Sequence, residues 1–222
     1  MPLSRRHFLG ALGVGAASAV AGPPLEAASP NAHRLEPIAA DWDVSWVDRV
    51  TGKFRAVFDS PEISEGDGMF RAIIWRDHHK AVYGTPIAEL SSVLVIRHTA
   101  IAMVMNDGFW ARYKLGKSEK IKDPETKKWS VVNPYRVAPP ETPPQWAGFS
   151  LEAFMQSGGI VLGCNLAFRV MVAMVAEAGK LKGEAARTKT LEYLIPGVIL
   201  QPSGVFAVMR AQQAGCHYML AS

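Results

Sequence analysis

The sequence predicts a three-layer α/β/α domain built on a mainly parallel sheet of five strands. Short β-prone runs alternate with helical segments five times along the chain. Residues 92–97 (SVLVIR) form a continuous apolar run of strand length, which is typical of a strand buried on both faces of a parallel sheet. Glycine, proline and small polar residues separate the runs.

The first half of the domain begins with a strand over residues 53–59, where apolar and polar side chains alternate. A helix is expected over residues 68–83, and residues 84–86 (GTP) end it. The apolar run 92–97 is the second strand. A helix over residues 100–113 is expected to follow it.

Residues 115–146 interrupt this alternation with a long polar stretch that contains six prolines. A loop of this length inside a domain is usually functional or mobile. We therefore expect an inserted loop that moves or makes contacts and that stays out of the core.

Regular secondary structure is expected again from Ser150, a candidate N-cap for a short helix over residues 152–155. Residues 160–164 (IVLGC) are expected to form the third strand. Asn165 can cap the helix that follows, which is expected to run to about residue 178.

The last part of the domain is expected to contain another short helix over residues 184–193. The fourth strand follows at residues 198–201. Ser203 can cap a helix that ends at Gln213, and residues 216–220 form the final strand.

The N-terminus has the pattern of a twin-arginine export signal. Arg5 and Arg6 precede an apolar run over residues 10–21. That run is shorter than the roughly 20 residues of a membrane-spanning helix, and residues 19–21 (AVA) supply a small-x-small cleavage site. We expect residues 1–21 to be a signal peptide, read by the twin-arginine export machinery, and the protein to reach the periplasm without a stable membrane span. The alternative is a chance pair of arginines.

The remaining chain divides into an irregular arm at residues 22–49 and the α/β domain at residues 50–222. The formal net charge is +4, and removal of the signal leaves about +2. Because no basic stripe accompanies so small a charge, we expect no nucleic-acid partner. The chain has no dinucleotide fingerprint after the first strand, no phosphate-binding loop, no nucleophile elbow and no zincin motif, so no cofactor or metal is expected.

The C-terminal third contains three characteristic segments: residues 194–198 (LIPGV), 202–205 (PSGV) and 210–215 (RAQQAG), followed by Tyr218. These segments resemble the C-terminal half of DsrE/DsrF-like proteins. Residues 164–169 (CNLAFR), after a short strand, are similar to that family's cysteine segment. The resemblance covers roughly residues 53–220.

The resemblance implies a five-stranded parallel sheet between helices, frequent homo-oligomers, and a cysteine that carries a persulfide during sulfur relay. The family's strand order places the second strand beside the third. The insertion at 115–146 and the export signal depart from the small cytoplasmic members, and fold alone does not give function.

Ligands of parallel α/β sheets bind at the carboxyl ends of the strands. Those ends carry Asp59, His98, Cys164 and Ser203. With the family's strand order, His98 and Cys164 are neighbours at roughly 5 Å strand spacing. Cys164 also precedes a helix, whose positive N-terminus favours the thiolate that acts as a nucleophile. We therefore name Cys164 and His98 as candidate catalytic residues.

Each of these residues also has a structural interpretation. Cys164 can be a small buried side chain that packs at a strand end. His98 can be a hydrogen-bonded structural histidine, Asp59 a turn residue and Ser203 only a helix cap.

A second candidate cluster lies at residues 106–113, where Trp110 and Tyr113 can form the aromatic wall of a pocket and Asn106 its polar anchor. The alternative is a helix end that frays into the insertion, with both rings packing it. Candidate ligand-binding residues are thus Asp59, Asn106, Trp110, Tyr113, Asn165 and Ser203.

The two cysteines, Cys164 and Cys216, are not expected to form a disulfide. One lies at the carboxyl end of its strand and the other at the amino start of the last strand, about 17 Å apart, whereas a disulfide needs Cα atoms within about 7 Å. Two functions remain open. The protein handles a sulfur species or small ligand at Cys164, or it is a non-catalytic periplasmic binding or assembly protein with a structural Cys164.

Overall fold

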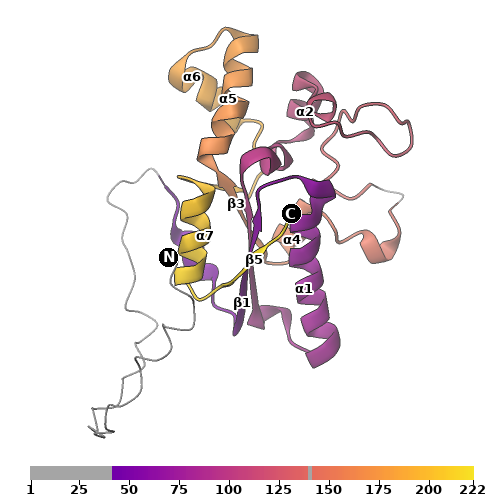
Figure 1. Ribbon diagram of the computed structural model, residues 1–222, viewed down its shortest axis with the longest axis vertical. Coiled ribbons are helices and arrows are strands. Elements are labelled where there is room, and N and C mark those ends of the chain that lie inside the picture. Colours follow the sequence, from indigo (N-terminus) through magenta and orange to yellow (C-terminus); the bar gives the residue numbers. More distant parts are fainter. Residues whose placement is uncertain (1–41, 140–141) are drawn as a thin grey trace, which may run out of the picture. The chain divides into compact units, whose positions relative to one another are not determined.

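The computed structural model describes residues 42–139 and 142–222 (Figure 1). The predicted signal peptide at 1–21, and the arm as far as residue 41, lie outside the described residues. Within them, five parallel strands form one sheet in the order β4-β3-β2-β1-β5. The strands are β1 (Phe54–Ser60), β2 (Leu90–Ile96), β3 (Ile160–Cys164), β4 (Ile199–Gln201) and β5 (His217–Leu220).

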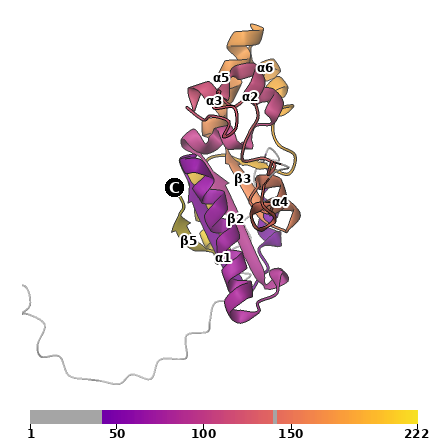
Figure 2. The same cartoon turned by 90° about the vertical axis from the view of Figure 1, so that its right-hand side faces the viewer.

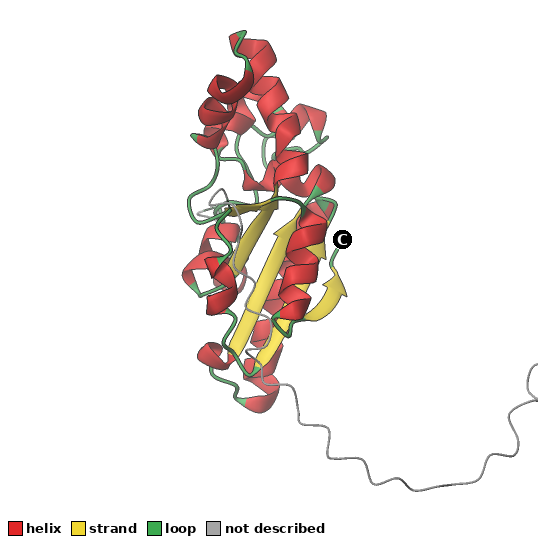
Figure 3. Ribbon diagram, turned by 90° about the vertical axis from the view of Figure 1, so that its left-hand side faces the viewer, coloured by secondary structure: helices red, strands yellow, loops and turns green. Residues whose placement is uncertain are grey.

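The sheet has helices on both faces, which confirms the predicted three-layer α/β/α class (Figure 3). Strand β2 lies in the centre and all of its residues are buried, as its apolar run predicts. It pairs in parallel with β1 on one side and with β3 on the other, with Ile96 opposite Ser60 and Gly163.

Successive side chains of each strand point to opposite faces, so the sheet divides the core into two clusters. Phe58 and Leu94 face a large cluster that includes residues of α1 (Asp67–Tyr83), α4 (Leu151–Gln156) and α5 (Asn165–Gly179).

The opposite face of the sheet, at Val57 and Val93, packs on α7 (Gly204–Gln213). Fully buried Trp46 packs here too, from the short 3-10 helix η2 (Ser45–Arg49), so this part of the predicted arm belongs to the domain core. Two more 3-10 turns, η3 (Ser64–Gly66) and η4 (Ile87–Glu89), flank α1.

Beyond the carboxyl edge of the sheet, α5 packs on α6 (Gly183–Leu191), and Figure 2 shows this pair of helices above β3. The expectation that Asn165 caps α5 is wrong. Cys164 is the N-cap residue, and Asn165 is already helical. Its side-chain oxygen instead accepts a hydrogen bond from Arg187 of α6 at 2.8 Å, which ties the two helices together.

The predicted single helix at 100–113 is in fact two helices. A 3-10 helix, η5 (His98–Val104), follows β2, and α2 (Asp107–Tyr113) begins after it. Met105 between them is extended and bridges to Leu194. The break has a local cause, because the Asn106 side chain accepts a hydrogen bond from the Phe109 amide and so caps a new helix.

The insertion contains the short helix α3 (Leu115–Ser118) and the 3-10 turn η6 (Pro144–Trp146). Our expectation that it stays out of the core is partly wrong, since Leu115 and Tyr135 belong to the large apolar cluster. Buried Asn133 donates to the carbonyl oxygens of Met103 and Met105, at 2.7 Å each. These bonds satisfy backbone groups that the broken helix leaves unpaired.

An ion-pair network also anchors the insertion at Arg136, three residues after Asn133. Arg136 binds Asp107 of α2 and, at 2.6 Å, Glu152 of α4. Burial raises the pKa of Asp107, but hydrogen bonds from Arg136 and from the Asn133 amide outweigh it, and the net pKa is lowered. The middle of the insertion, at residues 124–129, is exposed.

Candidate functional site

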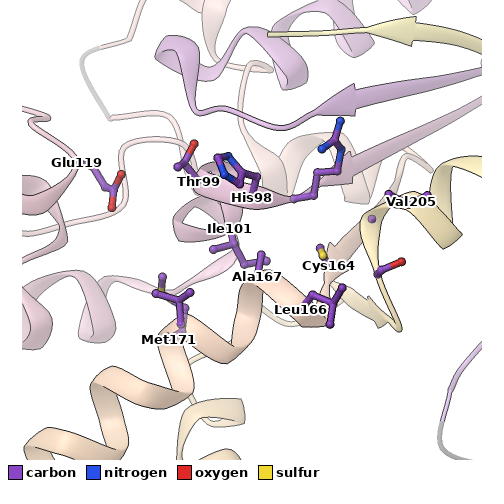
Figure 4. A pocket seen from close by; sticks show the side chains of 13 residues that line it. His98, Thr99, Ile101, Glu119, Cys164, Leu166, Ala167, Met171 and Val205 are labelled. Atoms are coloured by element: carbon purple, nitrogen blue, oxygen red, sulfur yellow. The ribbon is translucent and has the colours of Figure 1, made fainter.

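A cavity of about 500 Å³ opens at the carboxyl edge of the sheet, between η5 and the first turns of α5 and α7 (Figure 4). This is the edge at which parallel α/β sheets bind ligands. Its polar lining residues are Arg97, His98, Thr99, Glu119, Cys164 and Ser203. Its apolar lining residues are Ile101, Leu166, Ala167, Val170, Met171 and Val205.

Cys164 lies where β3 ends and α5 begins. As the N-cap residue it has an extended backbone, with φ −74° and ψ 112°, and its side chain lines the cavity. The residue is 6% exposed and has no disulfide. It directly precedes the first turn of the 15-residue helix α5.

His98 and Cys164 both line the cavity, and Figure 4 shows His98 next to Thr99. It is the first residue of η5, after the central strand, and its side chain is exposed. Its φ of 50° falls in the left-handed region, which is uncommon for a residue other than glycine. Such backbone strain persists only where the surroundings fix it, and it concentrates at ligand sites.

Asp59 lies at the same edge but does not line the cavity. Its carboxylate is buried and accepts hydrogen bonds from Arg97 Nε at 2.7 Å, Arg97 Nη2 at 2.9 Å and the Tyr218 hydroxyl at 3.0 Å. These donors occupy both oxygens, so Asp59 positions Arg97 in the cavity wall. The hydrogen bond to Asp59 also raises the pKa of Arg97, which stays charged.

Arg97 is a cavity residue that the sequence analysis did not identify. The signal available was its position, since it directly follows the central strand at the same edge as Asp59. Its stem also packs on α7, because a Cβ placed on Gly204 would lie 2.6 Å from Arg97 Cβ. Only glycine lets α7 begin this close to β2.

Ser203 is a helix cap that also lies in the cavity wall. Its hydroxyl accepts a hydrogen bond from the Phe206 amide at 3.0 Å, which caps α7, and the residue lines the cavity.

Glu119 is a second cavity residue that the sequence analysis missed. It follows α3, so the insertion contributes to the site. Burial raises the pKa of this carboxyl, more than a hydrogen bond with Ser118 lowers it. Figure 4 shows Glu119 and Thr99 at the side of the cavity away from Cys164.

The other predicted ligand-binding residues do not line this cavity. Trp110 is fully buried, and its indole donates to the Ala102 carbonyl at 2.9 Å. Tyr113 packs against Phe109 and Tyr193. Asn106 caps α2 and Asn165 binds Arg187, so hydrogen bonds within the fold occupy both amides.

Two further observations concern the described residues only. They contain no group of three or more His, Cys, Asp or Glu side chains arranged to hold a metal ion. They also contain no helix with the length and apolar character needed to cross a membrane.

Neither the protein-family models nor the curated proteins compared with this chain give a match. The class of protein therefore rests on the fold and on the cavity: an α/β domain with a free cysteine at the carboxyl edge of its parallel sheet.

Proposed function

We propose that this protein is an exported DsrE-like sulfur-handling protein that carries sulfane sulfur on Cys164. The observation that carries the proposal is the position of this free cysteine, at the start of α5 and in the wall of a cavity of about 500 Å³. A sulfur carrier needs a thiolate that a small donor can reach.

The remaining cavity groups have roles in this proposal. His98, which lines the same cavity, is the base that takes up the Cys164 proton. Asp59 fixes the Arg97 guanidinium in the cavity wall, where it can donate a hydrogen bond to a bound sulfur compound. The resemblance of residues 194–218 and 164–169 to DsrE/DsrF-like proteins supports the same activity, and it also suggests a homo-oligomer.

The test is sulfur loading in vitro. Purified protein is incubated with sodium tetrasulfide under argon, desalted and weighed by intact mass spectrometry before and after a reductant. We expect a gain of one sulfur that the reductant removes and that Cys164→Ser abolishes. Cys216→Ser is the matched control and should load normally. Equal loading of the wild type and Cys164→Ser would contradict the proposal.

The second candidate is a periplasmic binding protein without turnover, in which Cys164 only packs. The small exposure of Cys164, 6%, and the apolar cavity beside it favour this candidate. It predicts that a ligand binds the cavity of Cys164→Ser as tightly as that of the wild type, and that no sulfur is transferred.

A further inference from the structure

We infer that the cavity takes a low-molecular-weight thiol or persulfide whose body is uncharged and apolar. That body lies along α5 while its sulfur reaches Cys164. The inference rests on the proposed function and adds the class of sulfur compound to it.

The apolar side of the cavity is a surface of α5. Leu166 and Val170 are one helical turn apart, as are Ala167 and Met171, and all four line the cavity. From Cys164 to Met171 the helix rises about 10 Å. An apolar surface of this length, beginning at the sulfur, matches an organic group of about phenyl or hexyl size.

Leu166 and Val170 are both exposed, at 55% and 58%, and both belong to the cavity lining. Exposed apolar residues grouped at a concave site mark a place where an apolar molecule binds. An apolar ligand that covers both side chains removes their aliphatic surface from water, which contributes favourable binding free energy. A small ionic sulfur compound has no apolar surface to cover them and does not gain this contribution.

The charges at the cavity also disfavour an anionic donor. Arg97 is the lining residue with a permanent positive charge, and its pair with Asp59 leaves no net charge. Glu119 adds a carboxyl group at the other side. A charged ligand would lose hydration here, and the N-termini of α5 and α7 offer only partial positive charge to replace it. Sulfide or sulfite would also fill only a small part of about 500 Å³.

The transfer step balances without an oxidant. The Cys164 thiolate attacks the terminal sulfur of a persulfide R–S–S–H, and a new sulfur–sulfur bond forms on Cys164. The bond to the R-bearing sulfur breaks, and its electron pair leaves with R–S⁻. This thiolate takes up the proton that Cys164 released, so Cys164–SH and R–S–SH give Cys164–S–SH and R–SH.

The experiment compares benzyl persulfide with glutathione persulfide, which is charged. Each is generated in the assay under argon, and the initial rate of sulfur gain on Cys164 is measured by mass spectrometry. We expect the wild type to load faster from benzyl persulfide. The double variant Leu166→Gln/Val170→Gln should slow this donor about tenfold, while its rate with glutathione persulfide changes less than about twofold.

The matched control is Val82→Gln/Ile87→Gln, which changes two aliphatic residues that are similarly exposed, at 68% and 52%, and lie outside the cavity lining. It should behave as the wild type with both donors. Circular dichroism checks that both double variants are folded. Faster loading from glutathione persulfide, or equal slowing of both donors in the cavity variant, would overturn the inference.

A second readout separates the two proposals. Benzyl mercaptan, which has no sulfur to transfer, should raise the Tm of the wild type and of Cys164→Ser, but not of Leu166→Gln/Val170→Gln. Reduced glutathione should raise none of them. If no donor loads Cys164 and this pattern is still seen, the sulfur-carrier function fails and the apolar ligand class stands. Absence of any Tm shift with benzyl mercaptan would contradict the ligand class itself.

Discussion

Arg97 and Asp59 form a two-point ion pair between the carboxyl ends of β2 and β1, with Arg97 Nε 2.7 Å from Asp59 Oδ1 and Nη2 2.9 Å from Oδ2. Asp59 is almost fully buried, whereas the Arg97 side chain is 30% exposed. Buried Asp59 thus fixes the Arg97 guanidinium in the cavity wall, and the ion pair joins the ends of β1 and β2.

Asp59→Asn should weaken this pair and leave Arg97 without its counter-charge. We expect the free energy of unfolding to fall by about 2 kcal/mol, since a hydrogen bond to a charged group contributes about 1.5–3 kcal/mol. Urea unfolding measures the change. Glu125→Gln removes an equal charge from an exposed part of the insertion and should change stability by less than about 0.5 kcal/mol. Equal stabilities of the two variants would show that the pair contributes nothing.

Asn133→Ala tests whether the insertion is part of the folded core. The change removes two donors to the carbonyls of Met103 and Met105, so we expect a loss of about 2–3 kcal/mol in urea unfolding. Gln212→Ala, on the exposed surface of α7, is the control. A variant as stable as wild type would mean that the insertion is not anchored through Asn133.

The two cysteines should differ in reactivity. Burial raises the pKa of Cys216 to about 11, so only about one molecule in a thousand carries this thiolate at pH 8. Cys164 lines the cavity. Iodoacetamide at pH 8 should therefore label Cys164 first in the folded protein, as read by peptide mass spectrometry. Labelling of Cys216 first, or a disulfide between the two, would refute this assignment.

The proposed function includes export, and we expect export to depend on Arg5 and Arg6. Changing both to Lys keeps the charge but removes the twin-arginine pattern. We expect the variant to accumulate in the cytoplasm at precursor size, as seen by fractionation and immunoblotting. Changing Arg34 and Arg49 to Lys is the control and should not alter processing. Normal export of the Arg5, Arg6 variant would refute the twin-arginine pathway.

The elements of the sheet could be predicted because their signals are local. The apolar run before Arg97 fits a strand buried on both faces, and it became the central strand. Ser150 and Ser203 cap their helices as their sequence positions indicate.

The errors occur where a side chain bonds across the fold. Asn106 can continue an apolar helix or begin a new one, and the pairing of Met105 with Leu194 decides between them. Asparagine is a favoured N-cap residue, but the side-chain oxygen of Asn165 accepts a hydrogen bond from Arg187 instead. Neither partner can be found from nearby sequence.

The lining of the cavity was predicted only in part. Position at the strand ends and the family resemblance placed His98 and Cys164 at one edge, and both line the cavity. Glu119 was missed because it reaches the cavity from the insertion, and Arg97 was missed although its place directly after the central strand pointed to this edge. The wall predicted at Trp110 failed to reach the cavity because that ring fills the core.

The proposed function requires that Cys164 carries sulfur in the working protein. It is tested most directly by isolating the native protein from its cellular compartment under argon, without reductant, and recording its intact mass before and after tris(2-carboxyethyl)phosphine. We expect a fraction heavier by one sulfur, which maps to the Cys164 peptide, disappears on reduction and is absent from Cys164→Ser. A native mass that reductant leaves unchanged, with Cys164 recovered only as the free thiol, would contradict it.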